Sequence, residues 1–172
     1  MTVGAAVSAA AERLEAAGLA DPAEEARSLY ALCVCGATSA ATLDRYRPIS
    51  PALRERFERA VERRAAGWPQ QYAAGRANFR GHWLAVDRRV LIPRPETEGL
   101  VEAVVKQMQR ASSRLGAFAS VVADIGTGSG AIAIALALET AVAGVIATDI
   151  SGEALTLAME NAAALGARDR IA

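Results

Sequence analysis

The chain has 172 residues, of which 52% are hydrophobic and 22% are charged, and its formal net charge at pH 7 is zero. This composition is typical of a globular protein and excludes a disordered chain, and the balanced charge gives no argument for a nucleic-acid or membrane partner. The longest apolar run, Ala131 to Leu138, is far shorter than the roughly 20 residues of a membrane span, and the N-terminus lacks the basic segment of a signal peptide, so we expect a cytoplasmic protein.

Residues 1–70 are predicted to form a small bundle of four or five short helices. Asp21-Pro22 and Ser50-Pro51 each combine a good N-cap residue with a proline at the first helical position, and Glu24 stands where a capping box places an acid. Apolar residues at helical spacing predict the buried faces of three helices: Val7, Ala10, Ala11 and Leu14; Ala26, Leu29, Tyr30 and Cys33; Leu53, Phe57, Ala60 and Val61.

Arginines are concentrated between Leu43 and Arg94, where 12 arginines and no lysine stand beside 5 acids. One interpretation is a docking face for an acidic or RNA-associated partner. The other is a set of solvated helix faces in an arginine-rich proteome. The sequence leaves both open.

No metal site is expected. Cys33 and Cys35 are two residues apart, a spacing that points them to different faces of a helix, and no other cysteine or histidine cluster is near. We therefore expect a pair of reduced thiols. His82 is the only histidine and is assigned no role.

Residues 71–98 are predicted to form a linker, because aromatic and branched residues alternate there with Gly75, Gly81 and Asp87, as in a short hairpin. The block Leu91-Ile-Pro-Arg-Pro-Glu-Thr-Glu98 follows. Its prolines fix a rigid turn and its acids open a helix that we expect to run through Met108, with a loop or frayed end over residues 110–119. On physical grounds alone the block fits a structural linker as well as a substrate contact.

Residues 99–172 are predicted to contain the first β-α-β-α units of a parallel sheet. Two short apolar strands, residues 121–123 and 142–148, each end at an aspartate, and residues 131–139 form an apolar, buried helix between them. Ser151 caps a second helix, whose inner face we expect to consist of Ala154, Leu155, Ala158, Met159, Ala162 and Leu165. Ile171-Ala172 are predicted to open a third strand.

The clearest chemical signal is the segment Asp124-Ile-Gly126-Thr127-Gly128-Ser129-Gly130, a glycine-rich turn between a strand and a helix. Glycines allow a tight turn and the close approach of a ligand. Asp149, at the end of the next strand, is placed to accept both hydroxyls of a ribose. Together these features predict an adenosine cofactor on a doubly wound sheet.

Two cofactor classes and a ligand-free turn compete at this site. Gly126-x-Gly128-x-x-Ala131 also fits the dinucleotide pattern, which is weak evidence when it stands alone. Asp124 favours S-adenosyl-L-methionine, because a carboxylate two residues before the first glycine would repel a pyrophosphate and suits the ammonium group of a methionine moiety. We therefore predict that Asp124, Gly126, Thr127, Gly128, Ser129, Gly130 and Asp149 bind S-adenosyl-L-methionine.

The combination of the Leu91–Glu98 block and the glycine-rich turn resembles the release factor glutamine methyltransferase family (HemK/PrmC). Further matching features lie along nearly the whole chain: Tyr72-Ala-Ala-Gly75, Phe79-Arg-Gly81, Ala147-Thr-Asp149-Ile-Ser151, Ala154-Leu155 and Asn161-Ala162. The resemblance implies an α/β protein with a helical release-factor-docking domain (1–70), a hairpin linker (71–98) and the start of a class I, Rossmann-like methyltransferase sheet (99–172), truncated.

The family's activity is methyl transfer from S-adenosyl-L-methionine to the side-chain amide nitrogen of the glutamine in the Gly-Gly-Gln loop of peptide chain release factors. The resemblance implies an Asn-Pro-Pro-Tyr motif that holds this amide, but the sequence contains no Asn-Pro-Pro-aromatic stretch. We therefore assign no catalytic residue and expect an incomplete, inactive form. The alternatives are a non-catalytic partner-binding module and a related glutamine methyltransferase that acts on a ribosomal protein.

Overall fold

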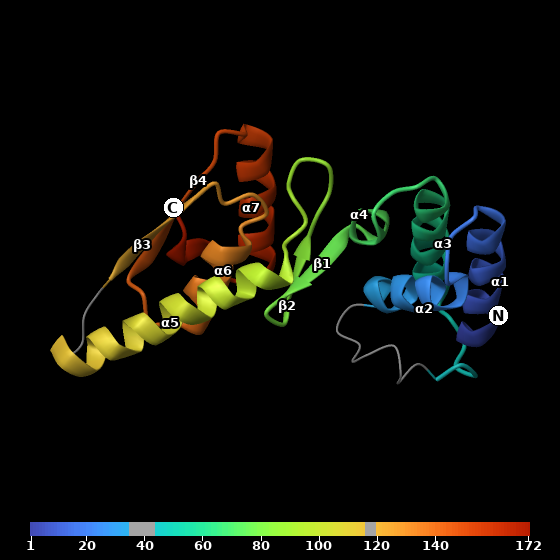
Figure 1. Ribbon diagram of the computed structural model, residues 1–172, viewed down its shortest axis with the longest axis horizontal. Coiled ribbons are helices and arrows are strands. Elements are labelled where there is room, and N and C mark those ends of the chain that lie inside the picture. Colours follow the sequence, from blue (N-terminus) through green and yellow to red (C-terminus); the bar gives the residue numbers. More distant parts are fainter. Residues whose placement is uncertain (35–43, 116–119) are drawn as a thin grey trace. The chain divides into compact units, whose positions relative to one another are not determined.

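The computed structural model describes residues 1–34, 44–115 and 120–172, apart from the side chains of residues 111–115. It divides into two compact units, Met1–Arg76 and Ala77–Ala172 (Figure 1). Cys35 lies outside the described residues, so the predicted thiol pair is described only at Cys33, which is buried. No helix in the described part of the chain is both long enough and apolar enough to cross a membrane.

The first unit contains four helices over its described residues: α1 (Val3–Ala16), α2 (Pro22–Cys33), α3 (Pro51–Ala65) and α4 (Gln70–Ala74). The buried face predicted for α2 is confirmed, since Ala26, Leu29, Tyr30 and Cys33 are all buried. The rings of Tyr30 and Phe57 meet edge to face with their centroids 5.2 Å apart. Helix packing around these rings forms the core of the unit.

Helix starts in this unit follow the capping rules at one predicted site and break them at the other. The Ser50 hydroxyl accepts a hydrogen bond from the Leu53 amide at 3.3 Å, as an N-cap does. The prediction for Asp21 is wrong, because its backbone is left-handed (φ 66°) and its side chain makes no capping bond. An N-cap side chain reaches the helix amides from an extended backbone. Glu24 instead pairs with Arg27 at 2.7 Å.

The boundary of the first unit contains a helix that the sequence pattern did not predict. Helix α4 follows Pro69 and ends at Gly75, whose backbone is left-handed. Tyr72 therefore lies in a helix, and the extended segment begins only after it. Strands β1 (Arg76–Phe79) and β2 (His82–Ala85) form a two-stranded sheet, which confirms the predicted hairpin. Arg80 and Gly81 both have positive φ, as a two-residue type I′ turn requires.

Helix α5 (Pro95–Leu115) begins at the second proline of the Leu91–Glu98 block, with Glu96 and Glu98 in its first turn. It continues through Leu115, so of the loop or frayed helix end expected from residue 110, residues 110–115 are helical and not a loop. No glycine or proline stands between Arg110 and Leu115 to end the helix. The remainder of that predicted loop, residues 116–119, lies outside the described residues.

The second unit is built on two parallel strands, β3 (Val121–Ile125) and β4 (Gly144–Thr148), which pair from Val121 opposite Gly144 to Ile125 opposite Thr148. Helix α6 (Ala131–Glu139) connects them and helix α7 (Gly152–Ala164) follows β4, ahead of the short 3-10 helix η2 (Arg168–Arg170) (Figure 1). Ile171 forms a parallel bridge to Val145, which confirms the opening of a third strand.

The core of this unit joins the sheet and α6 to the hairpin and α5. Phe79, Leu84 and Val101 are buried together with Ile134, Leu136 and Val145. The inner face of α7 differs from the prediction in part, since Met159 is half-exposed and its place is taken by Leu157 and Asn161. The unit is thus the α/β, Rossmann-like arrangement that the sequence predicted.

Candidate functional site

The glycine-rich turn, defined here as Gly126–Gly130, connects the carboxyl end of β3 to α6. The amides of Gly126 and Thr127 both donate to the Thr148 carbonyl at 2.8 Å, and the Gly130 amide donates to the Thr127 carbonyl at 2.9 Å. The turn is therefore anchored on the end of β4. This is the edge of a parallel sheet at which doubly wound proteins bind ligands.

Asp149 follows β4 and binds the turn directly. Its Oδ2 accepts the Gly128 amide at 2.9 Å, and its Oδ1 accepts the Ser151 amide at 3.0 Å. These bonds from the Ser151 and Gly128 amides lower the pKa of the Asp149 carboxyl below its ordinary value. An ionised, half-buried carboxylate therefore lies next to the middle of the turn, with lone pairs left for a further donor.

Asp124 lies inside β3 and is buried, with 7% of its surface exposed. Its Oδ2 accepts the Thr127 hydroxyl at 2.7 Å and the Ala133 amide at 3.1 Å. The Ala133 amide belongs to the first turn of α6, where the amides of a helix attract negative charge. The carboxylate of Asp124 thus already accepts one of the amides at the start of α6.

The outer surface of the turn is open. A side chain built on Gly126 or Gly128, which have φ of 80° and 54°, would meet no atom within 4 Å. Ile125, the last residue of β3, and Ile150, two residues beyond the end of β4, are 78% and 105% exposed. The structure therefore leaves room for a ligand against the turn, beside two apolar side chains.

Asn161, on α7, is a family match in the sequence without a predicted role, and the structure brings its side chain against the turn. It is 3% exposed, and its side-chain amide donates to the Ser129 carbonyl at 2.9 Å. The same side chain binds the backbone of Ala85 in β2. Its sequence signal is a polar residue on the apolar face of a helix, three residues after Ala158 and seven after Ala154.

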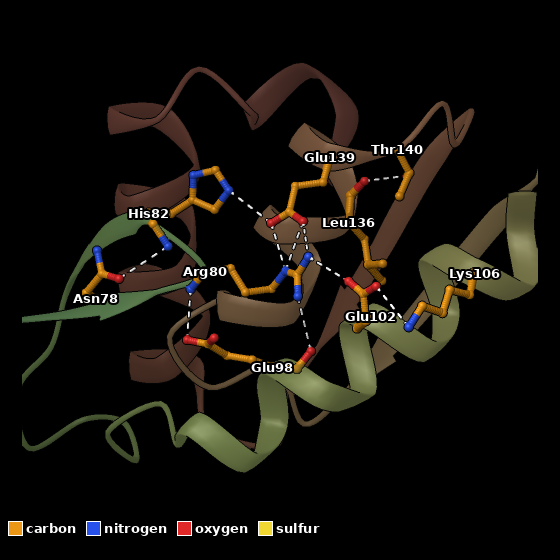
Figure 2. A network of polar contacts seen from close by, with 10 residues as sticks. Asn78, Arg80, His82, Glu98, Glu102, Lys106, Leu136, Glu139 and Thr140 are labelled. Carbon is orange, nitrogen blue, oxygen red and sulfur yellow. Dashed lines mark hydrogen bonds and ion pairs between the residues drawn. The ribbon is translucent and has the colours of Figure 1, made fainter.

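The Phe79-Arg-Gly81 segment is fixed to α5 and α6 by one guanidinium group (Figure 2). Arg80 binds Glu139 of α6 at 2.5 Å and Glu102 of α5 at 3.3 Å. Its amide donates to Glu98 Oε1 at 3.0 Å, so the last acid of the Leu91–Glu98 block has a structural contact. His82 lies 3.2 Å from Glu139 and belongs to the same cluster.

Over the described residues, no group of three histidine, cysteine, aspartate or glutamate side chains is arranged to hold a metal ion. A cavity of about 410 Å³ lies between α6, α7 and Ile171. Its lining includes Gly130 at the end of the turn but neither Asp124 nor Asp149, so it adjoins the site without containing its two carboxylates.

Several arginines of the arginine-rich segment, Leu43 to Arg94, form ion pairs with acids. On α3, Arg54 pairs with Glu58 at 2.7 Å and Arg59 with Glu55 at 2.5 Å, and all four side chains are exposed. Arg64 binds Glu25 of α2 at 2.8 Å. These contacts fit solvated helix faces and leave the docking interpretation open.

Comparison with known proteins gives matches along the chain. Residues 5–75 match the family model of the PrmC N-terminal domain, and residues 100–172 match that of the methyltransferase small domain. The chain is 42% identical over 172 residues to a release factor glutamine methyltransferase from Moorella thermoacetica, covering 99% of this chain and 58% of that protein. A protein of the same name from Agrobacterium fabrum is 38% identical over 169 residues, which are 98% of this chain and 58% of that protein. The chain therefore spans less than two thirds of the length of these relatives.

Proposed function

Because the chain belongs to the release factor glutamine methyltransferase family, we propose that its glycine-rich turn binds S-adenosyl-L-methionine for methyl transfer to a release factor. The acceptor is the side-chain amide nitrogen of the glutamine in the Gly-Gly-Gln loop. The family is one of methyltransferases by name and by domain. The identity of the cofactor, the identity of the substrate and the activity of the whole protein are what we propose here.

The hydrogen bond between the Gly128 amide and Asp149 is the observation that carries the proposal. An ionised carboxylate beside the turn supports contact with the ribose hydroxyls of a nucleoside that lies along the turn. Gly126, Thr127, Gly128, Ser129 and Gly130 would hold the methionine part on the open surface of the turn. The bound cofactor supplies an activated methyl group on a sulfonium, and these residues bind and orient it.

Asp124 supports this cofactor over a dinucleotide. Its carboxylate accepts a hydrogen bond from the Ala133 amide at the start of α6. Helix amides at this position are the donors that a pyrophosphate needs. A second negative charge at that point is unfavourable. A positively charged sulfonium and ammonium group are favoured by the same carboxylate.

The substrate side of the proposal assigns residues 1–70 to docking of the release factor and residues 71–98 to a linker. The arginine excess of this region would meet an acidic partner surface. An amide nitrogen is a poor nucleophile, so the reaction depends on holding it in line with the methyl group. Positioning of two bound molecules is the chemistry that we propose for the whole protein.

The proposal is tested by isothermal titration of the chain with S-adenosyl-L-methionine and, separately, with NAD. We expect binding of the first ligand and none of the second. Asp149→Asn replaces one carboxylate oxygen by a donor that faces an amide, and should weaken binding at least about tenfold, the loss of one charge-assisted hydrogen bond. Glu153→Gln removes an exposed acid from the first turn of α7 and is the matched control.

Two results would contradict the proposal. Tighter binding of NAD than of S-adenosyl-L-methionine would show that the proposed cofactor is wrong. Equal affinities for Asp149→Asn and Glu153→Gln would place the ligand elsewhere. Radiolabel transfer to a purified release factor rather than to ribosomal proteins, measured with the whole protein, tests the substrate.

A further inference from the structure

The side chain of Asn161 is buried on an otherwise apolar helix face. It is 3% exposed, on the same face of α7 as Ala154, Leu157, Ala158 and Ala162. A buried amide is unfavourable unless its hydrogen bonds are made. The contacts of this side chain therefore show what keeps it there.

Asn161 makes three hydrogen bonds, all to backbone groups outside its own helix. Its Oδ1 accepts the Ala85 amide at 2.8 Å, and its Nδ2 donates to the Ala85 carbonyl at 3.0 Å and to the Ser129 carbonyl at 2.9 Å. One acceptor and two donors meet one N–H and two carbonyls. Of the small side chains, a carboxamide alone offers this set, since a carboxylate has no donor and a hydroxyl has one.

Helix α7 approaches the same end of the turn at a second point. A side chain atom built on Gly130 would lie 3.2 Å from Ala158 Cβ and 3.1 Å from Ile134 Cδ1. Ala158 precedes Asn161 by one helical turn, so both lie on one face. The Ser129–Gly130 peptide is therefore held by a hydrogen bond at its carbonyl and by close packing at its glycine.

We infer that Asn161 is a positioning residue that fixes the Ser129–Gly130 peptide of the glycine-rich turn and couples that turn to strand β2. The inference rests on the proposed function for the identity of the ligand, S-adenosyl-L-methionine. The coupling acts through one side chain, which binds the turn and the hairpin at the same time. By linkage, a ligand that orders the turn also stabilises the contact between Asn161 and Ala85. Loosening that contact lowers the affinity of the turn for the ligand.

The variants that test this inference are Asn161→Asp and Asn161→Ser, with Leu157→Ala as the control. Asn161→Asp keeps the size and the acceptor for the Ala85 amide but loses both donors. Asn161→Ser is smaller and keeps one donor, so it serves where the aspartate variant does not fold. Leu157 is 1% exposed on the same helix, and its truncation weakens packing without touching the polar contacts.

The first readout is the affinity for S-adenosyl-L-methionine, by titration at a temperature at which each variant is folded. We expect about a tenfold loss for Asn161→Asp, as for one lost hydrogen bond with a carbonyl left unpaired. We expect Leu157→Ala to bind within about twofold of the unchanged chain, because no direct contact to the turn is removed. Equal losses in the two variants would overturn the inference.

The second readout is amide hydrogen exchange, which needs no ligand. In Asn161→Asp and Asn161→Ser we expect faster exchange at the amides of Gly126, Thr127 and Gly130, which bond within the turn and to β4, while the amides of α7 stay protected. Adding S-adenosyl-L-methionine should slow exchange at Ala85 in the unchanged chain and not in Asn161→Asp.

The two readouts separate the inference from the proposed function. If the unchanged chain does not bind S-adenosyl-L-methionine, the proposed function fails, and hydrogen exchange alone decides the role of Asn161. If the turn amides keep their protection in both Asn161 variants, the positioning role is refuted whatever the ligand.

Discussion

The two units of the molecule place their polar side chains differently. In the helical unit, Met1–Arg76, charged side chains pair at the surface or in half-buried positions, as Arg64 does with Glu25 and Arg59 with Glu55. In the unit Ala77–Ala172, four polar side chains are buried, and no others are in the described chain: Asp124, Thr127, Ser129 and Asn161.

This difference separates packing from function. All four buried polar residues belong to the glycine-rich turn or bind it. Apolar packing would stabilise a fold at least as well as such groups, which are tolerated only when fully bonded. A cluster of bonded polar groups in one unit therefore supports the proposed site there, whereas the helical unit has an apolar core.

The largest expected effect is in the helical unit. Phe57 is 2% exposed and packs against Tyr30, so Phe57→Ala should lower the free energy of unfolding of this unit by about 3–5 kcal/mol. Urea denaturation followed by circular dichroism measures the loss. Phe57→Leu, the control, should lose about 1.5 kcal/mol or less.

Phe57→Ala also tests the separation of the two units. Its affinity for S-adenosyl-L-methionine should stay within about twofold of the unchanged chain, since every residue of the proposed site belongs to the other compact unit, Ala77–Ala172. A loss of affinity that follows the loss of helical stability would break the comparison.

The second effect is at the turn. Gly130 has a φ of 82°, and an added Cβ would lie 3.1–3.4 Å from Ile134 and Ala158. Gly130→Ala should therefore lower the stability of the second unit by about 1–3 kcal/mol and weaken S-adenosyl-L-methionine binding. Thermal unfolding and titration measure the two losses.

Gly152→Ala is the matched control, because a Cβ there meets no atom within 4 Å and Gly152 begins helix α7. It should leave the affinity for S-adenosyl-L-methionine unchanged and the stability equal or slightly higher. Alanine lowers the conformational entropy of the unfolded chain and has a higher helix propensity than glycine. If both alanine variants behave alike, close packing at Gly130 is unimportant to the site.

The smallest effect is in the partly buried ion-pair network around Arg80. Arg80→Ala removes the partner of Glu139 and should reduce stability by about 1 kcal/mol at pH 7, because the two side chains keep 18% and 23% of their surface in contact with solvent, which screens the pair. Arg59→Ala, which breaks a more exposed pair on α3, should cost about 0.5 kcal/mol or less.

The pH dependence gives this prediction a sign. The hydrogen bond and charge of Arg80 hold the pKa of Glu139 below its ordinary value of 4.5. A carboxyl whose pKa is lower in the folded state stabilises the fold above the unfolded pKa and loses that contribution as the pH falls through the folded value. The difference in the free energy of unfolding between the unchanged chain and Arg80→Ala should therefore be largest at pH 7. It should disappear as the pH falls below about 4.5. A difference that grows on acidification would contradict it.

Local sequence signals predicted much of the fold. Ser50 and Ser151 cap their helices, the hairpin forms at Arg80-Gly81, and α6 spans its predicted residues. Each depends on neighbouring residues alone. At the site, sequence placed Asp124 and Asp149 beside the turn, and the structure brings both into hydrogen bonds with it. Their part in cofactor binding stays a prediction.

The misses have tertiary causes. Asp21 has a favourable cap identity but a left-handed backbone, which its own side chain does not determine. Asn161 acts on residues 32 and 76 positions away, so no local window reveals its partners. The contacts of Arg80 likewise reach Glu139, 59 positions along the chain. Contacts at such separations follow from the packing of whole elements.

The most direct test of the account is a two-dimensional amide NMR titration of the chain with S-adenosyl-L-methionine. We predict chemical-shift changes concentrated at Gly126–Gly130 and at Asp149–Ser151, with Ala85 responding through Asn161 and the helical unit unchanged. Shifts confined to the helical unit, or no shifts at saturating ligand, would contradict the claim that the buried polar cluster marks a cofactor site.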